Sequence, residues 1–219
     1  MPGNVRRLPV ALLAGYVVLS VVLAVHPYDR VTWWAENIPI WVIVAALVVT
    51  HRRFQFSNLA YLMMSVLVYM HTVGGHFTFE RVPFGWVTDA FGFERNHYDR
   101  IAHFSVGFYA YAIAEFLWVK RLSASKWVVS LFAVFAIFTV AAAYEIIEWL
   151  YAASSDPEAG AAFLGSQGDI WDAQQDMLAD GLGSIVAVLL FWASRSGRPS
   201  TATAAASRQP ARSREPGRP

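Results

Sequence analysis

The chain has 219 residues, of which 56% are hydrophobic, and its formal net charge at pH 7 is +1. Soluble domains of this size rarely reach that hydrophobic fraction, so the composition argues against a soluble protein. The sequence contains no cysteine, which excludes disulfides, thiolate metal sites and cysteine nucleophiles.

Six apolar segments follow one another along the chain, and each predicts a transmembrane helix. They cover residues 8–25, 38–50, 59–71, 101–119, 127–149 and 177–193. Eighteen or more apolar residues can span a hydrocarbon core roughly 30 Å thick. The second and third segments reach that length only when flanking polar residues such as Asn37 and Asn58 are included. We therefore expect an all-α, polytopic membrane helix bundle over residues 1–193.

Lysine and arginine predict the orientation of this bundle, because they concentrate in cytoplasmic loops. Only four of the seventeen basic residues fall on one side of a six-span arrangement, and the other thirteen fall on the opposite side. The sequence thus predicts a multi-pass protein of the bacterial inner (plasma) membrane with both termini in the cytoplasm. The four exceptions are Arg30, Arg81, Arg95 and Arg100.

Two segments outside the spans have distinctive compositions. Residues 72–98 are rich in Phe and Gly, which predicts a long outer loop that lies on the membrane interface as a lid. Residues 194–219 are rich in Arg, Ser, Ala and Pro, which predicts a disordered basic tail in the cytoplasm. The lipid bilayer is the expected partner of both, and no nucleic-acid partner is expected.

Histidines and acids gather at the predicted outer ends of helices 3, 4 and 5. His71 ends the third span, and His76 follows it. Asp99 and His103 are four residues apart and share a face of the fourth helix, and Glu145 and Glu148 share a face of the fifth. His71 alone is also typical of an interfacial histidine, and Glu148 alone of a solvated helix end.

The last span carries the clearest acidic pattern. Asp169 suits a helix N-cap, and Asp172, Asp176 and Asp180 follow at four-residue spacing, which places them on one face. Stacked carboxylates repel one another, so a cation, protonation or basic partners must compensate. Asp180 lies inside the membrane in this arrangement.

The combined set predicts a polar site at the outer membrane face. Histidine with carboxylates suits Zn²⁺ or Mn²⁺, and carboxylates alone suit Mg²⁺. In one hypothesis, metal-assisted chemistry acts on a lipid or envelope precursor, with Glu145 and His103 catalytic and with Arg95 and Arg100 binding an anionic head group. The predicted metal ligands are His71, His76, Asp99, His103, Glu145, Glu148, Asp172, Asp176 and Asp180.

Two other functions remain open from the sequence. The acids and His103 suit a proton- or cation-coupled transporter, although Glu115 is the one acid in the predicted inner half of the bundle. A non-catalytic membrane subunit is the other alternative, with the polar cluster holding helices together. The reaction, the substrate, the identity of the metal and the oligomeric state stay open.

Four motifs together resemble the YjdF family of bacterial inner-membrane proteins. They are His71-Thr-Val-Gly-Gly-His76, Tyr98-Asp-Arg-Ile-Ala-His103-Phe, Tyr144-Glu-Ile-Ile-Glu148-Trp and Gly168-Asp-Ile-Trp-Asp-Ala-Gln-Gln-Asp176-Met-Leu-Ala-Asp180. The likeness covers nearly the whole chain except the tail. It implies the membrane topology and a shared site rather than an activity.

A weaker similarity extends to VanZ-like membrane proteins, which carry an Asp-(Lys/Arg)-x-x-His helix start, a later Glu, and an Asp with Gly near the start of a last helix. Asp99, Arg100 and His103 match the first element. Glu145 or Glu148 matches the second, and Asp176 or Asp180 with Gly181 and Gly183 matches the last. This chain lacks a clear arginine between the Glu and the last helix. The resemblance implies head-group or envelope chemistry.

Overall fold

The computed structural model describes residues 7–196, without the side chains at positions 158, 159, 162 and 196. Every regular element in this range is helical, which confirms the all-α prediction. The elements are α1 (Arg7–Leu23), α2 (Arg30–Thr50), α3 (Asn58–Phe77), the 3₁₀ turn η1 (Phe79–Arg81), α4 (Gly85–Phe91), α5 (Tyr98–Val106), α6 (Tyr109–Val119), α7 (Lys126–Ser154), α8 (Pro157–Leu164) and α9 (Asp172–Ser196). The tail predicted to be disordered lies almost entirely outside the described residues.

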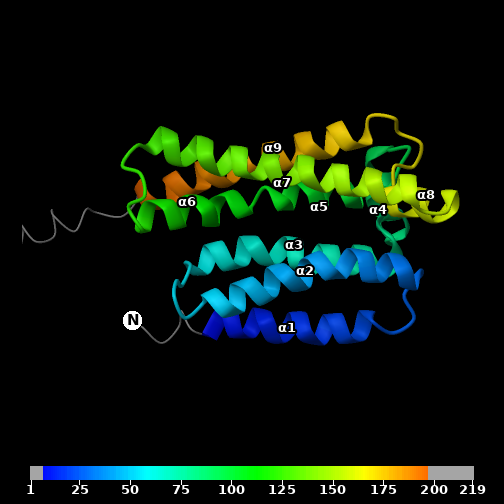
Figure 1. Cartoon of the computed structure of the whole chain (residues 1–219), viewed down its shortest axis with the longest axis horizontal. Helices are drawn as coiled ribbons and strands as arrows, with labels where there is room; N and C mark the ends of the chain where they lie inside the picture. The colour runs from blue at the N-terminus through cyan, green and yellow to red at the C-terminus, as the bar shows by residue number, and fades with distance from the viewer. Residues whose placement is uncertain (1–6, 197–219) are drawn as a thin grey trace, which may run out of the picture.

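The long helices run roughly parallel or antiparallel in two layers (Figure 1). One layer contains α1, α2 and α3, and the other contains α5, α6, α7 and α9. The layers meet where α3 packs against α5 and α6. The short helices α4 and α8 lie at one end of the bundle, and the described chain begins and ends at the other (Figure 1).

Helices α2 and α3 are longer than the apolar segments that predicted them. Asp29 caps α2, because its side chain accepts a hydrogen bond from the Thr32 amide at 2.5 Å. The helix therefore begins at Arg30 rather than at residue 38, and Glu36 becomes part of it. Helix α3 continues through Phe77 into the segment predicted as a loop, which also contains η1 and α4. With 21 and 20 residues, both helices reach the length that spans a bilayer.

The fourth predicted span is two helices, α5 and α6, separated at Gly107 and Phe108. A side-chain carbon at Gly107 would collide with the α9 backbone at Gly183 and Ser184, and one at Gly183 would collide with the carbonyl of Phe104. Because neither glycine has a side chain, the helix can be interrupted at Gly107, and its backbone packs directly against that of α9. This close approach fixes how α5 faces α9.

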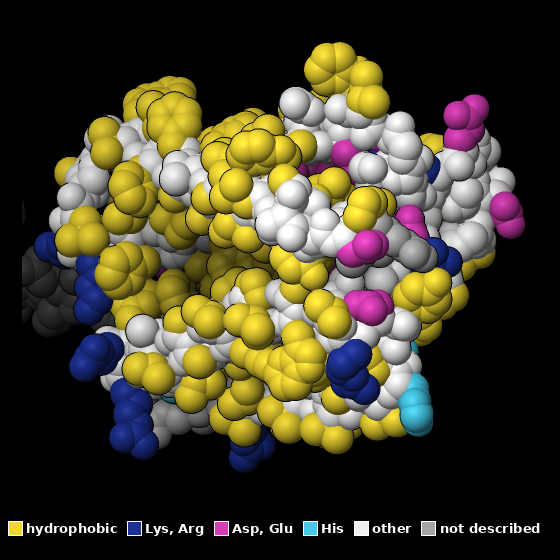
Figure 2. Space-filling model, turned by 45° about the vertical axis from the view of Figure 1, so that its right-hand side comes forward, with side chains coloured by type: hydrophobic (Ala, Val, Ile, Leu, Met, Phe, Trp, Pro, Cys, Tyr) yellow, Lys and Arg dark blue, Asp and Glu magenta, His cyan; other side chains and the backbone are white. Residues whose placement is uncertain are grey.

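The surface of the bundle suits a membrane. Hydrophobic side chains cover its middle, Lys and Arg gather toward one end, and acids lie toward the other (Figure 2). Within residues 7–196, three helices are long and apolar enough to cross a bilayer, namely Arg30–Thr50, Lys126–Ser154 and Asp172–Arg195. Helix α1 is apolar but has 17 residues.

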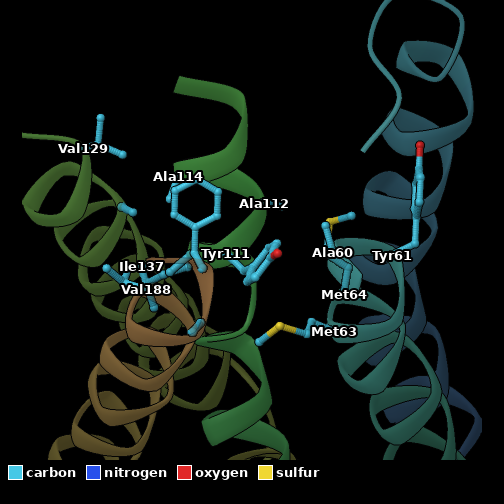
Figure 3. Close-up of a cluster of buried hydrophobic side chains, with 14 residues drawn as sticks. Ala60, Tyr61, Met63, Met64, Tyr111, Ala112, Ala114, Val129, Ile137 and Val188 are labelled. Atoms are coloured by element: carbon cyan, nitrogen blue, oxygen red, sulfur yellow. The ribbon is translucent and has the colours of Figure 1, made fainter. Parts of the chain in front are cut away.

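Small side chains form the core between the layers. Ala60, Met63 and Met64 of α3 face Tyr111 and Ala112 of α6 (Figure 3). The alanines allow the helix backbones to approach closely, and the flexible methionines fill the remaining space. At the end of the bundle that carries the basic residues, α3 and α6 are also linked by a polar contact.

Glu115 makes this contact. It is the acid that the transporter hypothesis needs in the inner half of the helix bundle. Its carboxylate accepts hydrogen bonds from the amide of Ser57 at 3.1 Å and from its hydroxyl at 2.9 Å. Ser57 is the N-cap of α3, so Glu115 stabilises the start of that helix. This role is structural.

Candidate functional site

His103 of α5 lies among three buried carboxylates from two helices. Its Nδ1 is 3.3 Å from Oδ2 of Asp180, and its Nε2 is 3.7 Å from Oδ1 of Asp99 and 3.8 Å from Oδ1 of Asp176. Asp180 is 1% exposed and Asp176 is 3% exposed. The four-residue spacing on each helix predicted these shared faces, and the packing of α5 on α9 brings the two faces together.

The other predicted acid of this face, Asp172, belongs to an ion-pair network nearer the helix end. Nη2 of Arg100 is 2.8 Å from Oδ1 of Asp172, and Nη1 of Arg95 is 2.7 Å from the same atom. Arg100 also pairs with Asp176, and Arg95 lies 3.4 Å from Asp169. Basic partners therefore offset part of the carboxylate repulsion that the sequence predicted.

Two predicted details of this region concern Asp169 and the arginines. Asp169 accepts a hydrogen bond from the Trp171 amide at 2.9 Å in the turn that precedes α9, and the helix itself begins at Asp172, three residues after the predicted cap. The two arginines also affect the neighbouring His97. The pKa of His97 is lowered below its usual value, mainly by burial and to a lesser extent by the positive charges of Arg95 and Arg100. Both guanidinium groups are paired with carboxylates, so their predicted role in binding an anionic head group stays a prediction.

His71 has a partner that the sequence did not reveal. Its Nε2 is 2.9 Å from Oε2 of Glu36, and the hydroxyl of Tyr144 donates to the same oxygen at 3.2 Å. Glu36 is 2% exposed. The predicted start of the second span at residue 38 left Glu36 outside the membrane helices, and that start is wrong because α2 begins at Arg30 and contains Glu36. The capping residue Asp29 was the signal for the earlier start.

The remaining predicted ligands lie in different surroundings. Nδ1 of His76 is 2.8 Å from the carbonyl oxygen of Leu23, so this histidine joins α3 to the end of α1. Oε1 of Glu145 is buried and has no hydrogen-bond partner among the described residues. Glu145 interacts electrostatically with His103 and Asp180. Glu148 lines a cavity beside the site.

This cavity has a volume of about 470 Å³ and lies between the two layers. Most of its wall is apolar, whereas one end is polar and includes His71, His103 and Tyr144. Binding sites for small molecules commonly combine an apolar wall with a few placed polar groups, in volumes of roughly 300–1,000 Å³. The cavity therefore places a ligand-sized space against the histidine–carboxylate cluster.

Asp99, His103 and Asp176 form the described group best placed to hold a metal ion. Each offers one ligand atom, and the three atoms lie within 4.8 Å of one another. Ligands at about 2.0–2.2 Å from a tetrahedral Zn²⁺ lie roughly 3.3–3.6 Å apart, so a small inward shift would suffice. Asp180 contacts the other ring nitrogen of His103, which is the arrangement that orients a metal-binding histidine.

Two comparisons with known proteins each cover most of the chain. The family model described as "Predicted membrane protein (DUF2238)" matches residues 8–197. The chain is 31% identical over 188 residues to the inner membrane protein YjdF of Escherichia coli (strain K12), an alignment that covers 84% of this chain and 90% of that protein. No solved structure matches.

Proposed function

The chain belongs to the YjdF family of integral membrane proteins, and on that premise we propose that it catalyses metal-assisted chemistry on a lipid or envelope precursor at the outer face of the plasma membrane. The observation that carries this proposal is the convergence of Asp99, His103 and Asp176 beside a large, mostly apolar cavity. A purely structural network would need no ligand-sized space next to it.

The proposal includes six transmembrane spans with both termini in the cytoplasm. Helices α1, α2, α3, α7 and α9 supply five spans, and the broken pair α5 and α6 supplies the other. The basic residues at helix ends support this arrangement, because Arg7, Arg53, Lys120, Lys126 and Arg195 all belong to the end of the bundle opposite α4 and α8. The histidine–carboxylate cluster then lies in the outer half of the membrane.

Each residue of the cluster has a distinct chemical role in this proposal. A divalent ion held by Asp99, His103 and Asp176 would polarise an ester or phosphoryl oxygen or activate water. Asp180 orients His103 so that Nε2 faces the other two ligands. Glu145, one buried oxygen of which accepts no hydrogen bond within the described part of the chain, is the candidate general base.

A second function, a non-catalytic membrane subunit, is supported by the arginine network, which shares Asp176 with the candidate metal ligands. Arg95 and Arg100 hold three carboxylates of α9 and of the turn before it, which fastens the start of α9 to the outer end of α5. Such a network stabilises packing without a ligand. We assign this structural role to the arginine network alone.

Metal content separates the two functions. The protein purified without chelators, and then dialysed against Zn²⁺ or Mn²⁺, should retain close to one ion per chain by elemental mass spectrometry. Asp99→Asn and Asp176→Asn should each lose it, whereas Asp89→Asn, a matched change of an exposed aspartate in α4, should not. Equal metal content in all four proteins would leave the scaffold function as the better account.

A further inference from the structure

We propose that the cavity takes up a membrane lipid with an amine-bearing head group, and that the lipid enters sideways from the outer leaflet between α2 and α7. This inference rests on the proposed function, because it names the substrate class for the same site. It is drawn from the mouth of the cavity, the distribution of polar groups along its length and the charge at its polar end.

The mouth of the cavity opens toward the hydrocarbon. Val42 of α2 and Val140 of α7 both line the cavity, yet they are 64% and 57% exposed. A lining residue that is also exposed lies at an opening, and these two lie in the middle of helices that are apolar enough to span a bilayer. Figure 2 shows the surface hollowed between the two layers. A molecule that enters here comes from the lipid phase.

Apolar side chains of α8 line the outer end of the cavity. Helix α8 contacts both α2 and α7, and its residues Phe163 and Leu164 line the cavity. Both side chains are apolar, and Phe163 is 8% exposed. These apolar side chains of α8 at the outer end favour the lateral route.

Polar and apolar groups are separated along the cavity in the way an amphiphile requires. On α2, Glu36 lies toward the outer end and Ile43 lies about 10 Å deeper, at 1.5 Å per residue. On α7, which runs in the opposite direction, Glu148 lies toward the outer end and Ile137 lies about 16 Å deeper. A lipid of the outer leaflet has the same polarity, with its head outward and its chain toward the membrane centre.

The charge of the polar end favours an amine. Glu36, Asp99, Glu148 and Asp180 line the cavity, and the lining residues that the structure describes include neither Lys nor Arg. Among the described residues, Oδ1 of the buried Asp180 has no hydrogen-bond partner, and buried acids are costly unless a partner compensates them. An ammonium group would supply that partner, and the ring of Tyr144 would add a cation–π contact.

Photolabelling from the bilayer tests this inference. The full chain is reconstituted into phosphatidylglycerol liposomes that contain a trace of phosphatidylethanolamine with a diazirine on one acyl chain, and labelled peptides are mapped by mass spectrometry after irradiation. We expect labels on the cavity segments around Ile43 and Ile137. The same diazirine chain on phosphatidylglycerol should label these segments at least several-fold less.

Blocking the mouth provides the decisive comparison. Val42→Trp and Val140→Trp should each reduce cavity labelling by about tenfold, whereas Val49→Trp and Val128→Trp, exposed valines of the same helices that do not line the cavity, should leave it unchanged. Labelling that persists in the mouth variants would overturn lateral entry. Labelling that is equal for the two lipids would overturn the amine head group.

The metal-site variant Asp176→Asn separates this inference from the proposed function, because Asp176 does not line the cavity. If it loses metal but keeps the lipid label, the cavity binds lipid independently of the metal. If the native protein binds metal but no lipid label enters the cavity, the metal site stands and the lipid inference fails.

Discussion

Oδ2 of Asp180 lies 3.3 Å from Nδ1 of His103, deep between α9 and α5. Asp180 is 1% exposed, so this contact is shielded from water. A carboxylate on Nδ1 fixes the tautomer and the ring orientation, and it leaves Nε2 directed at Asp99 and Asp176. The pair therefore joins the structural packing of two helices to the chemistry proposed for the site.

The first prediction concerns this positioning role of Asp180. Asp180→Asn keeps the size of the side chain and an oxygen that can accept from Nδ1, so the fold should persist. Loss of the carboxylate charge should weaken Zn²⁺ or Mn²⁺ binding by about 10–100-fold, measured by equilibrium dialysis and elemental analysis. Ser184→Ala, one turn further along α9 and equally buried, is the matched control. Unchanged metal affinity in Asp180→Asn would contradict the positioning role.

The second prediction concerns Arg100, which neutralises Asp172 and Asp176 at once. Its side chain is 16% exposed, and removing one member of a buried ion pair costs about 3–5 kcal/mol. Arg100→Gln should therefore lower the melting temperature in detergent by many degrees, and Arg100→Lys should lower it less.

Arg81 is the control for that measurement. Its side chain is 50% exposed, and it pairs with Glu80 at 3.2 Å, so Arg81→Gln should cost only about 0–1 kcal/mol. If Arg100→Gln and Arg81→Gln melted at the same temperature, the arginine network would not be what holds the start of α9.

The sequence predicts that Asp180 belongs to the site, whereas it does not predict Glu36. The period of the α-helix places Asp172, Asp176 and Asp180 on one face, because that information is local. Glu36 was missed, because hydropathy began its helix at residue 38, whereas the residue that caps α2, Asp29, lies nine residues before that start. Hydropathy locates apolar segments well and helix ends poorly.

Contacts between different helices also could not be predicted from the sequence. Nothing local indicates that Arg95, which precedes α5, reaches Asp172 at 2.7 Å, or that His76 turns away to the carbonyl of Leu23. The break at Gly107 was likewise hidden inside a continuous apolar run, because its cause is the α9 backbone that packs against it. Such features follow from which helices become neighbours.

The third prediction tests that packing directly. Gly107→Ala places a carbon against the backbone of Gly183 and Ser184, where neither side can yield as a flexible side chain would. Overpacking of this kind typically costs 1–3 kcal/mol, and here it should also displace Asp180 from His103. We expect a lower melting temperature together with weaker metal binding. Gly85→Ala, which has open space around it, should change neither; a native-like Gly107→Ala protein would contradict the close approach of α5 and α9.

The last prediction tests the orientation of the bundle, which determines whether the site faces outward. The chain has no cysteine, so a single introduced cysteine reports its own position. In intact cells, a membrane-impermeant maleimide should label Asp89→Cys, in α4 at the acidic end, and should label Arg53→Cys, between α2 and α3, only after permeabilisation. Both positions are exposed, so a difference in labelling reflects the side of the membrane rather than burial. The reverse pattern would place the histidine–carboxylate site on the cytoplasmic side, and an outer-leaflet lipid could then not be its substrate.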